Sequence, residues 1–68
     1  MSEIQDIVAQ YTELPDHVDA PLELDSLDVV SLVEDLEEAF GLVVRPSEVV
    51  PANFGTLLAI EAFVQARR

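Results

Sequence analysis

The side chains able to take part in covalent chemistry are few in this sequence. It contains no cysteine, and His17 is the only imidazole that could activate a serine hydroxyl. No serine lies in the Gly-x-Ser-x-Gly pattern of a nucleophile elbow. His17 itself stands between two prolines and is expected to be a solvated loop residue. The sequence therefore predicts a protein that is not an enzyme.

The fourteen acidic residues raise the question of a metal site or an acid–base pair. No segment has the Asp-x-Asp-x-Asp-Gly spacing of an EF-hand loop, and none supplies its closing glutamate. Carboxylates on the flank of a helix usually form a solvated face, and few basic groups are present to tune a pair of them. We expect no metal site and no catalytic residue.

One serine has a distinctive setting. Ser26 lies between Asp25 and Leu27, directly after a loop and at the start of the strongest predicted helix. Asp and Ser are both favourable N-cap residues, so Ser26 could serve only as a helix cap, with Leu27 a stray exposed apolar residue. The pattern alone leaves that interpretation and a functional serine equally open.

Periodic apolar residues place the first half of the chain in two helices. A helix over about 2–14 has its apolar residues on one face, and Ser2 with Gln5 fits a capping box. A loop over 15–25 contains two prolines. The second helix, over about 26–40, ends at Gly41, a typical C-cap residue.

The second half of the chain is predicted to form a short helix and a longer one. Leu42, Val43 and Val44 are expected to form an extended loop, followed by a short helix over about 47–50. Asn53 is expected to cap the last helix, over about 53–66. Residues 1–68 are thus predicted to form a single all-α domain, a small antiparallel bundle of three main helices and one short helix.

Composition narrows the possible partners. The formal net charge is −11 and the only basic residues are three arginines, so the chain should repel nucleic acids and anionic membranes. Half of the residues are hydrophobic, which argues against a disordered acidic tail. No apolar run is long enough to span a bilayer, and no secretory signal is visible. We expect a cytoplasmic monomer that binds basic patches on other proteins and does not insert into membranes.

The helix over 26–40 has an acidic side that also carries two apolar residues. Leu27 falls in the middle of the charged side and Val30 near its edge. Such a mixture favours a docking surface for partner proteins. The predicted partner-binding residues are Leu27, Asp28, Val30, Ser31, Glu34, Asp35 and Glu38.

The sequence of this region resembles that of the acyl carrier protein family. The resemblance rests on Asp25-Ser26-Leu27-Asp28, on Leu32-Val33 and on Leu36-Glu37-Glu38-Ala39-Phe40-Gly41, and it continues to Asn53-Phe54-Gly55-Thr56. The tripeptide Asp-Ser-Leu alone is weak evidence for this family, because so short a motif occurs often by chance. Combined with the acidic helix, the chain length and the charge, it becomes specific.

The resemblance implies that Ser26 receives a 4′-phosphopantetheine arm from coenzyme A, with Asp25 and Leu27 beside the attachment point. It implies a phosphopantetheinyl transferase as one partner, and acyl-loading and acyl-processing enzymes with basic docking patches as others. The arm's thiol would carry an acyl group as a thioester. The free amides and the positive dipole end of a helix N-terminus suit a phosphodiester. In the family that the chain resembles, an acyl chain can shelter between the helices. The candidate lining residues are Val29, Val33, Leu36, Val50, Phe54 and Ile60, and plain core packing is the alternative role of each.

Two departures from the family pattern bear on the pathway. Glu23 stands where similar carriers often have glycine, and Leu24 where they have a smaller residue. The connection from Leu14 to Ser26 is also shorter than in fatty-acid carriers. These departures favour a specialised fatty-acid, lipid or polyketide carrier. The alternatives are a stand-alone peptidyl or aryl carrier and, from another class, an acidic adaptor or inhibitor protein in which Ser26 is only a cap.

Overall fold

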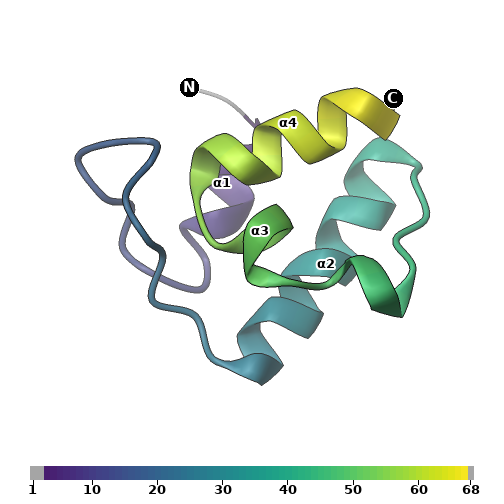
Figure 1. The fold of residues 1–68 in the computed structure, drawn as a ribbon, viewed down its shortest axis with the longest axis horizontal. Coiled ribbons are helices and arrows are strands. Elements are labelled where there is room, and N and C mark those ends of the chain that lie inside the picture. Colours follow the sequence, from purple (N-terminus) through teal and green to yellow (C-terminus); the bar gives the residue numbers. More distant parts are fainter. Residues whose placement is uncertain (1–2, 68) are drawn as a thin grey trace.

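The protein is described by a computed structural model over residues 3–67, and it is helical with no strand in that range. In chain order the elements are α1 (Glu3–Val8), α2 (Ser26–Phe40), the 3₁₀ helix η1 (Pro46–Glu48), α3 (Pro51–Phe54) and α4 (Leu57–Arg67). In Figure 1, helix α2 rises diagonally from the bottom of the molecule to its right-hand side, and α4 lies along the top. The predicted all-α class is confirmed.

The core lies where α1, α2 and α4 face one another. Leu32 and Leu36 of α2 and Ile60 of α4 are completely buried. Each such aliphatic side chain contributes about 1.5–3 kcal/mol through removal from water. The other buried apolar residues in the described range are Ile4, Ile7, Val8, Val33, Leu42, Phe54, Leu57 and Val64.

Helix α2 has the bounds that the sequence predicts. Its C-terminal cap, Gly41, has a left-handed φ of 65°, and its N–H donates to the Glu37 carbonyl. Glycine adopts this conformation without the steric penalty that a side chain brings. The following residues are extended, as expected: Leu42 is buried, whereas Val43 remains exposed.

Helix α1 is shorter than the predicted helix over 2–14, because it ends at Val8. Beyond that point the Gln10 N–H donates to Ile7 and the Tyr11 N–H donates to Val8, both three residues back. These bonds tighten the chain into turns that leave the helical path. Ser2, the proposed capping-box residue, lies outside the described residues.

Tyr11 ties this turn to the middle of α2. Its hydroxyl donates a hydrogen bond to the Asp35 carboxylate, 24 positions away in the sequence. That bond, together with partial desolvation and the nearby carboxylates, raises the pKa of Tyr11 above its ordinary value, because each disfavours the phenolate. The contact gives the end of α1 a fixed partner that helical periodicity does not reveal.

The loop between α1 and α2 is docked onto the junction of α3 and α4 by two backbone hydrogen bonds. The Leu22 N–H donates to the Gly55 carbonyl and the Leu58 N–H donates to the Val18 carbonyl, each at 2.8 Å. At Gly55 an added Cβ would lie 2.5 Å from the Pro51 carbonyl oxygen, so a side chain could not be accommodated without a shift. This docking leads the chain to the start of α2.

The last predicted helix, over 53–66, is divided in two. Pro51 occupies the first turn of α3, where the missing N–H costs nothing. Asn53 is inside α3 and its side-chain amide donates to the Glu48 carbonyl. The capping role predicted for Asn53 is therefore wrong; Thr56 fills it, because its hydroxyl accepts from the Ala59 N–H at 3.0 Å. The short helix is also shifted, from 47–50 to η1.

Among residues 3–67, no helix combines the length and the apolar character required to cross a membrane.

Candidate functional site

Asp25 and Ser26 have different roles at the start of α2. Asp25 is the N-cap, with extended backbone angles, and its carboxylate accepts the Asp28 N–H at 2.8 Å. Ser26 is the first helical residue and is exposed. Within residues 3–67 its hydroxyl has no hydrogen-bond partner. The Ser26 hydroxyl therefore does not form the capping hydrogen bond of α2, and its oxygen is accessible to another molecule.

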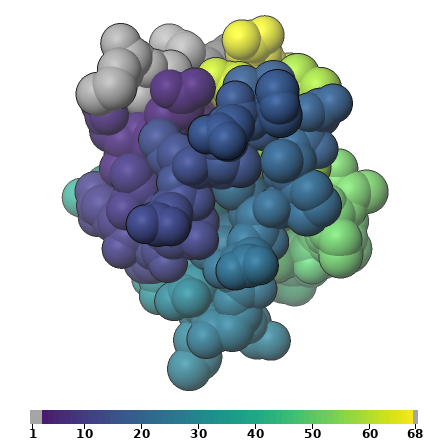
Figure 2. Space-filling view, turned by 90° about the vertical axis from the view of Figure 1, so that its left-hand side faces the viewer, coloured from purple at the N-terminus to yellow at the C-terminus, as the bar shows by residue number. Residues whose placement is uncertain are grey.

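The electrostatic setting of Ser26 combines a helix end with a carboxylate. Helix geometry leaves the amides of Ser26 and Leu27 without intrahelical partners, and they point toward the helix entrance. The fifteen-residue helix places the positive end of its dipole there. Figure 2 shows this first turn of α2 projecting from the lower end of the molecule, where a second protein can reach it.

An apolar groove opens beside Ser26. It has a volume of about 410 Å³. One part of its wall comes from the loop before α2 and from α2, the other from the segment between η1 and α4. The residues that line it are Leu22, Leu24, Asp25, Ser26, Val29, Val30, Val49, Val50, Pro51, Phe54 and Gly55.

The groove includes only some of the apolar residues that the sequence suggested as a lining. Val29, Val50 and Phe54 line it. Val33, Leu36 and Ile60 instead belong to the buried core. Sequence reasoning did not identify the lining residues Leu22, Leu24, Val49 and Pro51. The alternation of Leu22 and Leu24 around the exposed Glu23 was the available signal, since it indicates an extended segment with one apolar side.

The outward side of α2 carries the predicted docking residues in two groups. Leu27 is 79% exposed and Val30 51% exposed, close to Ser26. Exposed polar residues continue this surface along the helix: Ser31, Glu34 and Glu38. Asp28 and Asp35 are half-buried.

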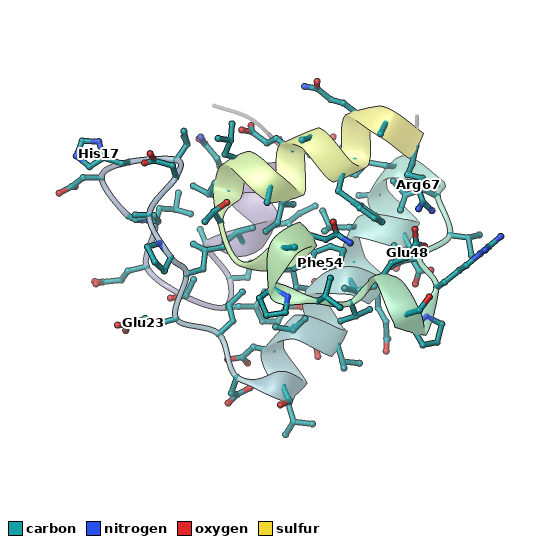
Figure 3. The ribbon with its side chains drawn as sticks, in the orientation of Figure 1. His17, Glu23, Glu48, Phe54 and Arg67 are labelled. Atoms are coloured by element: carbon teal, nitrogen blue, oxygen red, sulfur yellow. The ribbon has the colours of Figure 1, made fainter. Side chains whose placement is uncertain are left out.

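Two acidic residues of α2 have intramolecular partners. Asp35 accepts the Tyr11 hydroxyl, and the Glu37 carboxylate accepts the Val44 N–H at 2.9 Å. These carboxylates stabilise the fold as well as adding charge. His17 is exposed at the tip of the loop, away from the first turn of α2 (Figure 3). No group of three or more metal-binding side chains is present within residues 3–67.

Comparison with family models identifies the chain. The model of the phosphopantetheine attachment site matches residues 2–64, nearly the whole sequence. Searches among curated proteins and among solved structures found no match. Within residues 3–67 the exposed Ser26 hydroxyl at the entrance of α2 has no partner, which makes it chemically suited to a covalent phosphodiester. The chain belongs to the phosphopantetheine attachment site family, whose domains bind 4′-phosphopantetheine covalently and act as carriers.

Proposed function

We propose that residues 1–68 form a single acyl carrier domain and that Ser26 is its attachment residue. The observation that carries this proposal is the position of the Ser26 hydroxyl, exposed at the entrance of α2 and at the rim of the apolar groove. In the attachment step the Ser26 oxygen forms a bond to the phosphorus that bears pantetheine in coenzyme A. The pyrophosphate bond breaks, the nucleotide part leaves, and the serine proton passes to a base of the transferase. The attached group supplies a thiol that carries the acyl chain as a thioester.

The other hydroxyl side chains in the described range are less suitable. Ser31 and Ser47 are exposed, but neither lines the groove. The Thr56 hydroxyl is already engaged with the Ala59 N–H. Among residues 3–67, only Ser26 therefore combines a free hydroxyl with a place in the lining of the groove. Incubation with coenzyme A, magnesium and a broad-specificity transferase should add the mass of one phosphopantetheine to the intact protein. An acidic adaptor protein, the rival from another class, would remain unmodified.

We further propose that partners dock on the outward side of α2. Leu27 and Val30 supply apolar contact close to Ser26, with Asp25 at the helix entrance. Glu34, Glu38 and the polar Ser31 extend the surface, and Asp28 and Asp35 add charge at its edge. Long-range attraction to a basic patch accelerates encounter without tight binding, as a carrier that visits several enzymes requires.

The partner surface predicts a salt-sensitive modification rate. At low ionic strength, Glu34→Lys should slow modification by the transferase roughly twofold to fivefold, since it removes attraction at the rim of the interface. Added salt should slow the wild type and shrink the difference between them. Glu13→Lys, the same change in the exposed loop before α2, is the matched control. A transferase rate that does not vary with salt, or equal rates for the two variants, would contradict the docking surface.

The groove favours an apolar acyl cargo over an amino acid. Apart from Asp25 and Ser26, its lining side chains are aliphatic, aromatic or proline, and the Asp25 carboxylate already accepts the Asp28 N–H. Octanoyl-loaded protein should therefore show shifted methyl resonances for Val29 and Val50 relative to unloaded, pantetheinylated protein. Glycyl-loaded protein should show unchanged resonances at both residues. Shifts of equal size with the two cargoes would favour a peptidyl carrier. Fatty-acid, lipid and polyketide pathways all supply such acyl cargo.

A further inference from the structure

Arg67, near the end of α4, forms an ion pair with Glu48 of η1. Its two terminal nitrogens contact the two Glu48 carboxylate oxygens, with Nη1 3.1 Å from Oε1. Nη1 also lies 3.4 Å from the Val43 carbonyl oxygen. The two labelled side chains approach each other in Figure 3. A planar guanidinium that engages both oxygens fixes direction as well as distance, which an ammonium group does not.

Glu48 transmits this contact to the segment that follows η1. Its Oε1 accepts the Arg45 N–H at 2.9 Å, which closes the start of η1. Its backbone carbonyl accepts the Asn53 side-chain amide at 2.8 Å, which joins η1 to α3. The segment between Glu48 and Asn53 lines the groove through Val49, Val50 and Pro51. The position of this wall therefore depends on Glu48 at both of its ends.

A second path runs from Arg67 through aromatic rings. The Arg67 guanidinium carbon lies 4.7 Å from the centre of the Phe63 ring, in the range of a cation–π contact. The Phe63 ring is in turn 5.1 Å from the Phe54 ring at an interplanar angle of 53°. Phe54 is 3% exposed and lines the groove. Two independent paths thus connect one arginine to the same wall.

We propose that Arg67 and Glu48 are positioning residues that set the width of the groove beside Ser26. They hold the wall formed by 49–54 against α4 and so fix its separation from α2. An apolar chain borne at position 26 then finds a space of defined size. The part of this inference that concerns cargo rests on the function proposed above, whereas the position of the wall does not.

The size of the effect follows from exposure. The Arg67 and Glu48 side chains are 35% and 19% exposed, so water and salt weaken their attraction. A partly exposed ion pair together with one cation–π contact shifts an equilibrium by roughly threefold to tenfold. The groove should loosen on their removal, while the fold persists.

A label at position 26 tests the proposal without any modification by phosphopantetheine. The chain has no cysteine, so Ser26→Cys accepts a single thiol-reactive, solvatochromic naphthalene dye. Its emission gives the ratio of groove-bound to solvated dye. In this background, Arg67→Met should lower that ratio roughly threefold to tenfold, because it removes both the ion pair and the cation–π contact. Glu48→Gln should lower it less, because the contact between Arg67 and Phe63 remains. The double variant should resemble Arg67→Met, because that substitution already removes the ion pair with Glu48.

The matched control is Arg45→Met. It removes the same charge near η1, but the bond from Arg45 to the Glu48 carboxylate comes from the backbone N–H, which the substitution retains. Arg67→Lys, which keeps the charge but loses the planar fork, should give an intermediate ratio. Circular dichroism verifies that each variant is folded, and Val49 and Val50 methyl shifts report the wall directly. Equal ratios for Arg67→Met and Arg45→Met, with unchanged methyl shifts, would overturn the proposal. Because the protein is never pantetheinylated, failure here is distinct from failure of the attachment site.

Discussion

Ser26→Ala should accept no phosphopantetheine, whereas the wild-type protein is converted to a form heavier by one such group. The substitution removes the oxygen that forms the phosphodiester bond. It should leave the helix intact, because the cap of α2 is the Asp25 carboxylate bound to the Asp28 N–H. Intact-mass spectrometry after incubation with coenzyme A, magnesium and a transferase measures the loss directly. The expected effect is complete rather than partial.

A serine outside the proposed docking surface provides a matched control for this loss. Ser47→Ala removes an exposed hydroxyl from η1 and should be modified as completely as the wild type. Digestion of the modified wild type should place the added mass on a peptide containing Ser26. An adduct on Ser26→Ala would refute the assignment, as would its loss on Ser47→Ala. Equal circular dichroism spectra for Ser26→Ala and wild type would exclude unfolding as the cause of the loss.

Leu36→Ala should leave the chain largely unfolded at room temperature. Leu36 is completely buried between α2 and the rest of the core. Truncation of such a leucine costs about 2–5 kcal/mol, through lost burial and the cavity left behind. A domain of this size rarely has more than about 3–5 kcal/mol of net stability. Far-ultraviolet circular dichroism and urea titration should show loss of helix and a midpoint near zero denaturant.

Leu27→Ala is the comparison that separates burial from residue type. It is the same substitution on the same helix, but Leu27 is 79% exposed. Its free energy of unfolding should change by no more than about 0.5 kcal/mol. Its modification by the transferase should nevertheless slow, because Leu27 adjoins Ser26 on the proposed docking surface. A Leu36→Ala protein with the wild-type urea midpoint would show that the core is not organised around this residue.

Helix α2 could be predicted from the sequence because its signals are local. Asp25 and Gly41 mark its ends through contacts with residues three or four positions away. The end of α1 depends instead on Tyr11 reaching Asp35, and the break between α3 and α4 on Gly55, whose carbonyl accepts the Leu22 N–H. Such contacts join segments far apart in the chain, and periodicity carries no information about them.

The candidate site divides in the same way. The candidate site at Ser26 could be predicted because Asp25 and Leu27 are its direct neighbours in the sequence. The groove was only partly foreseen, because its wall combines α2 with the distant residues 49–55. The pair of Arg67 and Glu48 is separated by 19 positions and belongs to no motif. Only folding brings these two residues together.

Because Asp25 is the helix cap, modification of the neighbouring Ser26 need not disturb the start of α2. The hydrogen bond that starts α2 does not involve the Ser26 hydroxyl, so it can persist when that oxygen becomes esterified. Unmodified and modified chains can then share one helix entrance, and attachment need not await or trigger folding. A transferase meets a surface that is already assembled, and removal of the group would restore the same starting structure. Modification and folding are in this sense separable events, kept apart by one carboxylate.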